Sequence, residues 1–296
     1  MRVFVTGASG WIGSAVTDEL LGAGHEVLGL ARSDASAASL QSKGAAVQRG
    51  DLDDLESLRA GAEAVDAVIH LANKHDFANP AVSNLAERNA VETIGEALSG
   101  SNRTFIVASG VPGTVGRAGT ENDPSPFHGL ESARGGSENR ALEFVDHDVN
   151  VVAARFAPTV HGAGDYGFMA VLVNIARERG VSGYPGDGAN RWPAVHRSDA
   201  ARLVRLGLEQ ATPGTILHAM AEEGIPTREI AEAIGRGLGL PVESVAPDDA
   251  PAHFGWIGAF FGRDIPSSST ISRERFGWTP TGPTLIEDLE GGVYFG

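Results

Sequence analysis

The sequence predicts an α/β fold in which a doubly wound parallel sheet is joined to a smaller, interleaved C-terminal domain. Six short apolar runs alternate with segments of helical spacing through the first 155 residues. Glycines crowd the turn between the first run and the first helix, and after Arg155 the alternation gives way to Gly- and Pro-bearing turns. Strands and helices in alternation indicate a parallel sheet, because right-handed crossovers place helices on both of its faces.

The predicted strands are short apolar runs, and segments with apolar residues at helical spacing separate them. The strands are Arg2–Thr6, Glu26–Leu30, Ala46–Arg49, Ala67–His70, Phe105–Ala108 and Val149–Arg155. The helices between them are Trp11–Ala23, Ala35–Lys43, Leu55–Ala60, Ala81–Leu98 and Glu131–Val145. Three more helices are predicted in the second half, at Phe168–Arg179, Ser198–Gln210 and Thr227–Leu238.

Composition excludes several classes of site and partner. The 296 residues are 42% hydrophobic, enough for a core that hides roughly three quarters of the surface of the unfolded chain. A net charge of −15 argues against nucleic acid and anionic membranes as partners, because both require clustered Lys and Arg. No stretch approaches the ~20 apolar residues of a membrane span and no secretion signal is evident, so we expect a cytoplasmic protein. The lack of cysteine excludes thiolate zinc sites and cysteine nucleophiles, and we expect no bound metal.

The turn after the first predicted strand has glycine at every third position, in the segment Gly7-Ala8-Ser9-Gly10-Trp11-Ile12-Gly13. Between a first strand and a first helix, this spacing is typical of a Rossmann-type site for a nicotinamide dinucleotide. Gly7 permits the tight turn, Gly10 lets the backbone approach the pyrophosphate, and Gly13 lets the helix pack closely on the strand. The free amides and dipole of the helix then receive the phosphate charge. We expect the dinucleotide to contact Gly7, Ser9, Gly10, Trp11, Ile12 and Gly13.

This turn defines the expected domain organisation. Residues 1–157 form the dinucleotide-binding Rossmann domain. Residues 158–296 form mainly a substrate domain, and part of the 190–222 segment returns to the Rossmann sheet.

The end of the second predicted strand indicates NADP rather than NAD. An NAD site usually has an acidic residue here against the ribose 2′-hydroxyl, whereas this chain has Arg32 followed by Ser33. An arginine suits a 2′-phosphate because it can donate two hydrogen bonds at once, and Ser33 adds a further donor. Alternatively, Arg32 is a solvated surface residue, and NAD is then the cofactor.

Two further strand ends lie where open α/β sheets bind their ligands. Asp51 and Leu52 follow the third predicted strand, and Leu71 and Ala72 follow the fourth. Asp51 can accept a hydrogen bond from the adenine amino group while Leu52 flanks the ring. Alternatively, Asp51 caps the following helix, and the sequence does not decide between these roles.

Five segments together resemble the extended or atypical short-chain dehydrogenase/reductase superfamily, in its NAD-dependent epimerase/dehydratase-like branch. They are Thr6–Gly13, Gly50–Leu52, His70–Ala72, Arg155–Gly162 and Pro193–Ala201, and the similarity extends to Phe276–Pro280. The resemblance implies an NAD(P)-binding Rossmann domain and a small-molecule substrate bound partly by the C-terminal domain. It also implies that Leu71, Ala72 and Pro158 line the cofactor site, and a homodimer formed through a helix pair is the family's common assembly.

The chain departs from that family at its acid–base pair. Members typically use Tyr-x-x-x-Lys, in which the lysine lowers the pKa of the phenol while a serine orients the substrate carbonyl. Here no tyrosine is followed by lysine at the fourth place. On the predicted helix Arg134 falls at the lysine position and Leu130 at the tyrosine position. Arg134 can bind ribose or phosphate, but it stays charged and cannot act as a general acid.

Three residues remain as catalytic candidates. Ser109 follows the fifth predicted strand and matches the family's serine, so it can hold a substrate carbonyl; alternatively it only forms a turn. The proton then comes from His161, from Tyr166, from water or from the substrate itself. The resemblance places the segment that begins at Pro158 near the nicotinamide.

The leading interpretation is an NADP-dependent oxidoreductase that reduces a carbonyl or imine of a small organic molecule by hydride transfer. An iminium substrate already carries positive charge and needs no phenolic proton donor. Two alternatives stay open: an epimerase or dehydratase with tightly held NAD(P), and a non-catalytic NADP-sensing protein.

Overall fold

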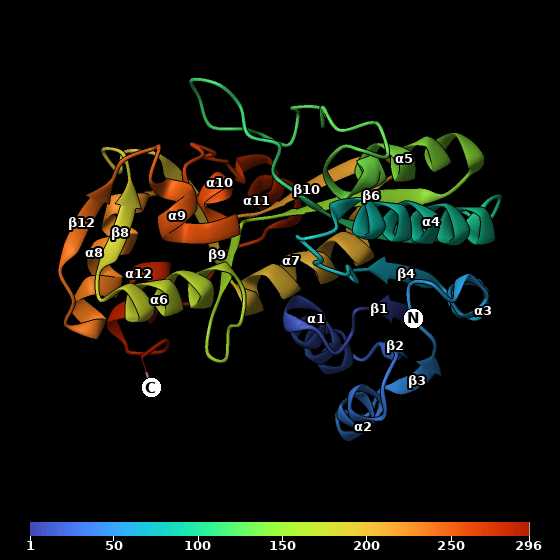
Figure 1. Cartoon of the computed structure of the whole chain (residues 1–296). Helices are drawn as coiled ribbons and strands as arrows, with labels where there is room; N and C mark the ends of the chain where they lie inside the picture. Colours follow the sequence, from blue (N-terminus) through green and yellow to red (C-terminus); the bar gives the residue numbers. More distant parts are fainter. Residues whose placement is uncertain (296) are drawn as a thin grey trace.

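A seven-stranded parallel sheet forms the centre of the computed structural model, which describes residues 1–295 (Figure 1). The strand order is β10-β6-β5-β4-β1-β2-β3. The bounds are β1 (Arg2–Thr6), β2 (Glu26–Ala31), β3 (Ala46–Arg49), β4 (Ala67–His70), β5 (Thr104–Gly110), β6 (Asn150–Phe156) and β10 (Thr215–Ala219). The reversal of strand order beside β1 is that of a Rossmann fold, which confirms the predicted fold class.

Helices cover both faces of this sheet because its strands are apolar on both sides. Along β1, Val3 and Val5 face one hydrophobic core while Phe4 faces the other. The first core is closed by α1 (Trp11–Gly22), α2 (Asp34–Ser42) and α7 (Arg197–Gln210). The second is closed by α3 (Leu55–Glu63), α4 (Pro80–Leu98) and α5 (Ser137–Leu142).

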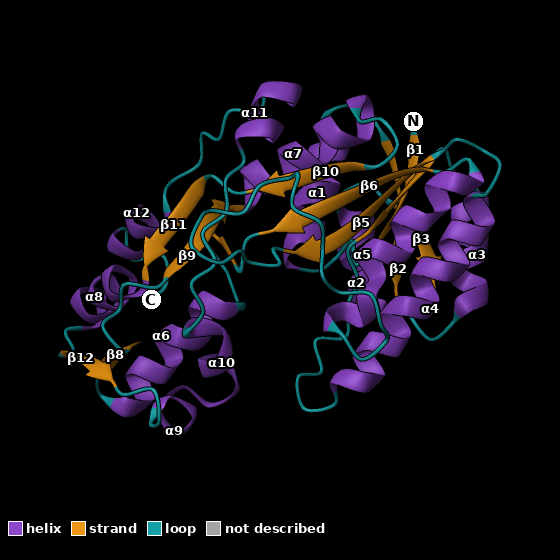
Figure 2. Cartoon of the chain, turned by 90° about the horizontal axis from the view of Figure 1, so that it is seen from above, coloured by secondary structure: helices purple, strands orange, loops and turns teal. Residues whose placement is uncertain are grey.

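The second half of the chain builds a smaller body beside the sheet (Figure 2). Its strands form a three-stranded sheet in the order β11-β9-β7 and a pair of β12 with β8. These strands are β7 (Thr159–His161), β8 (Ser182–Pro185), β9 (Arg191–His196), β11 (Glu222–Pro226) and β12 (Val242–Val245). Its helices are α6 (Phe168–Arg179), α8 (Thr227–Leu238), α9 (Ala250–Phe254), α10 (Gly258–Phe261) and α12 (Leu285–Glu290). The fully buried Trp192 lies in its core.

Three later elements of the chain pack mainly on the first body. α7 and β10 lie between β9 and β11 in the sequence, yet α7 packs against α1 and β10 pairs with β6. The helix α11 (Thr270–Phe276) packs against α7 and β10 before the chain returns to α12. Within residues 1–295, no helix combines the length and the apolar character that a bilayer crossing requires.

The predicted helix Glu131–Val145 is wrong in its first part. A short 3₁₀ segment, η1 (Ala133–Gly136), precedes α5, which begins only at Ser137. Arg134, Gly135 and Gly136 have φ of +53°, +61° and +64°, the left-handed region. A Cβ on Gly135 would lie 2.5 Å from the carbonyl oxygen of Asn84 on α4, so this close approach of two backbones requires glycine.

Three histidines are buried at strand positions: His70 on β4, His161 on β7 and His218 on β10. Burial lowers the pKa of each ring below 6.5, because the charged form loses its hydration inside the protein. For His218, Nδ1 lies 2.8 Å from the carbonyl oxygen of Ser268, which fits a neutral ring that donates from this nitrogen. The folded chain therefore binds fewer protons at these positions than the unfolded chain does.

We predict that the protein loses stability as the pH falls from about 7 to about 5.5, because the unfolded chain takes up protons at ~6.5 that the folded chain refuses. His218→Gln should reduce this slope in thermal denaturation measured across that range. His147→Gln, at an exposed position, is the matched control. Equal slopes in the wild type and His218→Gln would contradict the assignment.

Candidate active site

The glycine-rich turn after β1 is built around close contacts between backbone atoms. Gly7 has φ of +67°, and its carbonyl accepts a hydrogen bond of 2.9 Å from the amide of Gly10. A Cβ on Gly13 would collide with that same carbonyl, and a Cβ on Gly7 would lie 2.8 Å from the amide nitrogen of Ala72. Helix α1 begins at Trp11, and no side chain caps Gly10 before it. Its first amides are therefore oriented to receive an anion.

The ends of β1 and β4 lie side by side at this turn. The hydroxyl of Thr6 accepts a hydrogen bond of 3.2 Å from the amide of Ala72, and its oxygen lies 2.8 Å from Nδ1 of His70. Leu71 and Ala72 are both half-buried. The structure thus brings Leu71 and Ala72 against the turn.

At the end of β2, Arg32 is exposed, and Ser33 caps α2 by accepting from the amide of Ser36. A second arginine lies beside this turn, and the sequence alone does not reveal it because its position depends on the pairing of β3 with β2. Arg49 ends β3 and is paired in register with Ala31. Its guanidinium donates to the carbonyl of Ser33 at 2.8 Å and to Asp34 at 2.6 Å. Two arginines therefore flank one turn.

Asp51 and Leu52 have structural contacts at the end of β3. Oδ1 of Asp51 accepts from the amides of Asp53 at 2.8 Å and Asp54 at 3.1 Å, so it shapes the turn. The residue that caps α3 is Asp54, which corrects the alternative that Asp51 does so. Leu52 is buried and packs in the second core.

A buried carboxylate organises the region where the acid–base pair of the family was expected. Glu87 on α4 is fully buried. One of its oxygens accepts from Arg134 at 2.6 Å and the other from Asn73 at 2.8 Å, while His70 lies 3.8 Å away. Glu87 was missed because a glutamate in a helix is usually solvated, although Ala86, Ala90 and Val91 beside it mark a buried face. Arg134 is consequently tied to α4 as an ion-pair partner.

Ser109 lies at the carboxyl end of β5 and is half-buried. Its contact with the carbonyl of Gly110 is long, 3.5 Å, so this bond constrains the hydroxyl weakly. Its register partner on β6 is Arg155, which is buried and paired with Glu138 on α5 at 2.6 Å. Pro158 is half-buried just after β6. Ser109 and Pro158 thus lie at the carboxyl ends of neighbouring strands.

His161 is fully buried in the second body, on β7. Its Nδ1 lies 2.6 Å from Asp288 on α12, and its ring packs against His196 at 5.6 Å between centroids. A ring with no exposed surface cannot meet a substrate at the sheet edge. We therefore assign His161 a structural role in place of the predicted proton transfer.

Tyr166, by contrast, is 67% exposed and lies edge-on to Trp11, with 6.0 Å between the ring centroids. Arg197 stacks on Trp11 at 4.4 Å. The loop that carries Tyr166 is fastened by Tyr294, whose hydroxyl donates to Asp165 at 2.8 Å. Tyr166 is therefore brought to the glycine-rich turn.

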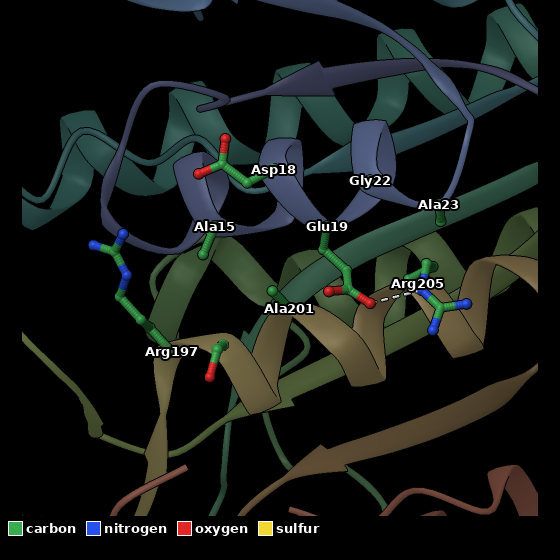
Figure 3. A pocket seen from close by; sticks show the side chains of 9 residues that line it. Ala15, Asp18, Glu19, Gly22, Ala23, Arg197, Ala201 and Arg205 are labelled. Atoms are coloured by element: carbon green, nitrogen blue, oxygen red, sulfur yellow. Dashed lines mark hydrogen bonds and ion pairs between the residues drawn. The ribbon is translucent and has the colours of Figure 1, made fainter. Parts of the chain in front are cut away.

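The groove between α1 and α7 is a separate surface feature. Figure 3 shows Glu19 on α1 meeting Arg205 on α7, an ion pair of 2.7 Å. Asp18 and Arg197 also line this groove, whereas no predicted site residue is among its lining residues. We interpret it as the seam between two packed helices.

Comparison with known proteins agrees with this architecture. The model of the NAD dependent epimerase/dehydratase family matches residues 3–134. An uncharacterized protein of Schizosaccharomyces pombe is 45% identical over 297 residues, covering 100% of both chains. The 2-alkyl-3-oxoalkanoate reductase of Stenotrophomonas maltophilia is 27% identical over 81% of this chain and 77% of its own. The dTDP-glucose 4,6-dehydratase of Streptomyces venezuelae, solved with NAD bound, superposes with a TM-score of 0.78 at 22% identity, covering 99% and 96% of the two chains.

We predict opposite outcomes for two alanine substitutions in the turn. Gly10 has φ of −76°, and a Cβ there meets only the carbonyl oxygen of Gly7 at 3.1 Å, a tight contact that a shift of a few tenths of an ångström relieves, so Gly10→Ala should fold with a smaller loss of stability than Gly13→Ala. The added Cβ should keep the pyrophosphate away from the backbone amides. Dinucleotide binding should therefore weaken at least about tenfold, the equivalent of one lost charge-assisted hydrogen bond. Gly13→Ala should instead lower the unfolding free energy by about 1–3 kcal/mol or more, because its Cβ collides with rigid backbone. Calorimetric titration and thermal denaturation separate the two effects, and unchanged binding by Gly10→Ala would contradict the assignment of the turn.

Proposed function

The chain belongs to the NAD dependent epimerase/dehydratase family, and we propose that it acts as an NADP-dependent oxidoreductase, reducing a carbonyl or imine of a small organic molecule. One observation carries the proposal. The glycine-rich turn leads into the uncapped start of α1, whereas Arg134, permanently charged and paired with Glu87, lies where the resemblance would place the lysine of the acid–base pair. An epimerase or dehydratase that depends on a phenolic base has no tyrosine to use there.

The glycine-rich turn fits a bound dinucleotide. The uncapped start of α1 and the narrow approach between Gly7 and Ala72 leave backbone, and no side chain, to face a pyrophosphate. The residues that would hold the cofactor are Gly7, Ser9, Gly10, Trp11, Ile12, Gly13, Leu71, Ala72 and Pro158. When bound, NADPH supplies the hydride from C4 of its nicotinamide.

Arg32 and Arg49 support NADP over NAD. They flank the Ser33–Asp34 turn beside the end of β2, where the ribose of an adenosine moiety is bound in this fold. A 2′-phosphate would replace the carboxylate of Asp34 as the partner of Arg49 and would recruit the exposed Arg32. We assign no cofactor contact to Arg134, because its guanidinium serves Glu87.

Ser109 is the residue we assign to the substrate oxygen. Its hydroxyl is held only weakly by the protein, so it can donate to a carbonyl placed at the end of β5. The proton that completes the reduction of a ketone comes from water or from the exposed Tyr166. An iminium substrate brings its positive charge with it, and the reaction then needs no acid from the chain. The reductase from Stenotrophomonas maltophilia supports carbonyl reduction as the reaction class.

We predict that Arg32→Ala and Arg49→Ala each weaken NADP binding about tenfold or more, because each removes a charge-assisted hydrogen bond, and leave NAD binding unchanged. Calorimetry with both cofactors measures the ratio of the dissociation constants. Arg59→Ala, which removes an exposed arginine paired with Glu96, is the control. Equal affinity of the wild type for the two cofactors would refute the NADP assignment.

Ser109→Ala should lower kcat for a ketone about 10²-fold or more, the usual effect of removing a donor to a developing oxyanion. The loss should be smaller for a cyclic iminium, and the affinity for NADPH should not change. The measurement is NADPH oxidation over a panel of ketones, aldehydes and cyclic imines. Full turnover by Ser109→Ala would remove the serine from the mechanism. If no compound is reduced although NADP binds tightly, the sensing role replaces the enzyme.

A further inference from the structure

Four aromatic side chains from distant segments form a partly exposed cluster, and one of them is carried by the loop that contacts the glycine-rich turn through Ala72. The aromatic cluster consists of Phe77, Phe168, Trp256 and Phe260. Phe77 lies in the loop between β4 and α4, and Phe168 is the first residue of α6. Trp256 lies in the short 3₁₀ segment η3 (Gly255–Ile257), and Phe260 lies in α10. Phe77, Trp256 and Phe260 are 43%, 43% and 38% exposed.

One side of the aromatic cluster is fixed by the core of the second body. The ring of Phe168 lies 6.0 Å from that of the buried Trp192. The indole of Trp192 donates to the carbonyl of Phe260 at 3.2 Å, and its ring packs against Phe261 at 5.1 Å. The wall that presents Trp256 and Phe260 is therefore a rigid part of this body.

The other side of the aromatic cluster, Phe77, lies in the loop that leads away from the glycine-rich turn. Phe77 is five residues beyond Ala72, which contacts the glycine-rich turn. Between them, Asn73 is bonded to the buried Glu87, and Asp76 accepts from the amides of Ala78 and Asn79 at 3.1 and 3.0 Å. The loop that reaches the cofactor edge thus also places Phe77 on Trp256.

The rings of Phe77 and Trp256 are stacked. The two planes are 13° from parallel, and their centroids lie 4.2 Å apart. Offset-stacked pairs of this kind contribute more than their buried area. Large apolar side chains that remain exposed together are typical of a binding surface. Here the loop that carries one of them also contacts the glycine-rich turn.

We propose that the aromatic cluster is the substrate wall of this site and that it takes a planar aryl ketone, whose ring stacks on Trp256 in the place that Phe77 holds here. The proposal rests on the proposed function and names its substrate class. A π-face binds a flat ring well, and none of the four side chains carries a charge for a diphosphate. In the reaction, the carbonyl carbon would gain a hydride from bound NADPH and the oxygen would gain a proton from water, which would leave an alcohol, oxidised NADP⁺ and a hydroxide ion that the buffer neutralises.

The test compares aryl ketones with their saturated counterparts. Acetophenone and cyclohexyl methyl ketone have the same skeleton, and only the first has a π-face. In ligand-observed NMR titrations of the NADP-bound protein, acetophenone should bind about three- to tenfold more tightly, the factor that aromatic stacking supplies. Trp256→Leu should abolish this preference, and Trp256→Phe should restore part of it. Phe77→Leu should tighten acetophenone binding, because the competing ring is gone.

Val115→Ala is the control, because Val115 is a fully exposed apolar side chain outside the aromatic cluster. Equal affinity for the two ketones in a protein that binds NADP normally would overturn the aryl ketone proposal alone. Loss of the preference in Val115→Ala as well would also overturn it. Failure of the wild type to bind NADP would contradict the proposed function instead. Tighter binding of UDP-glucose than of acetophenone would assign the wall to a sugar nucleotide and refute the proposal.

Discussion

The burial of one charge, the carboxylate of Glu87, constrains the region around the candidate site. A carboxylate without hydration is tolerated only when ion-paired or hydrogen-bonded, and here Arg134 and Asn73 supply both of its partners. Asn73 belongs to the loop after β4, and Arg134 belongs to the left-handed segment before α5. The same side chain on α4 therefore holds the loop that leads to Phe77 and the segment that approaches α4 through Gly135.

The sequence has no Tyr-x-x-x-Lys pair, and the backbone before α5 shows why such a pair would need a different local structure here. A tyrosine and a lysine on a regular helix would need that helix to begin several residues earlier. Here Gly135 and Gly136 adopt left-handed backbone angles, and the helix begins only at Ser137. The guanidinium of Arg134 in this segment is directed to Glu87. The segment is thus unsuited, in backbone as well as in side chains, to a tyrosine and a lysine four residues apart on one helix.

Much of the fold could be predicted because its signals are local. The strands β1, β3 and β4 and the glycine-rich turn need only a few neighbouring residues to be recognised. The remaining site depends on contacts between distant segments. Arg49 becomes significant only when β3 lies beside β2, and Glu87 only when Arg134 reaches it. His161 follows a strand of the large sheet in sequence, but β7 pairs with β9 in another sheet and carries the ring toward Asp288. The doubled glycine at positions 135 and 136 was the one local signal that a regular helix would not begin at Glu131.

The path of the chain between the two bodies has a consequence for how they can move and come apart. After β9 the chain goes back to add α7 and β10 to the large sheet, leaves to form β11 and α8, and returns again with α11 before it ends beside α12. Several separate segments of the chain therefore cross the boundary between the two bodies. No single cut releases either body as a continuous piece, and the crossings together restrain a wide hinge opening. This path of the chain therefore favours ligand entry through small displacements of loops, such as the one that carries Phe77, over a wide separation of the two bodies.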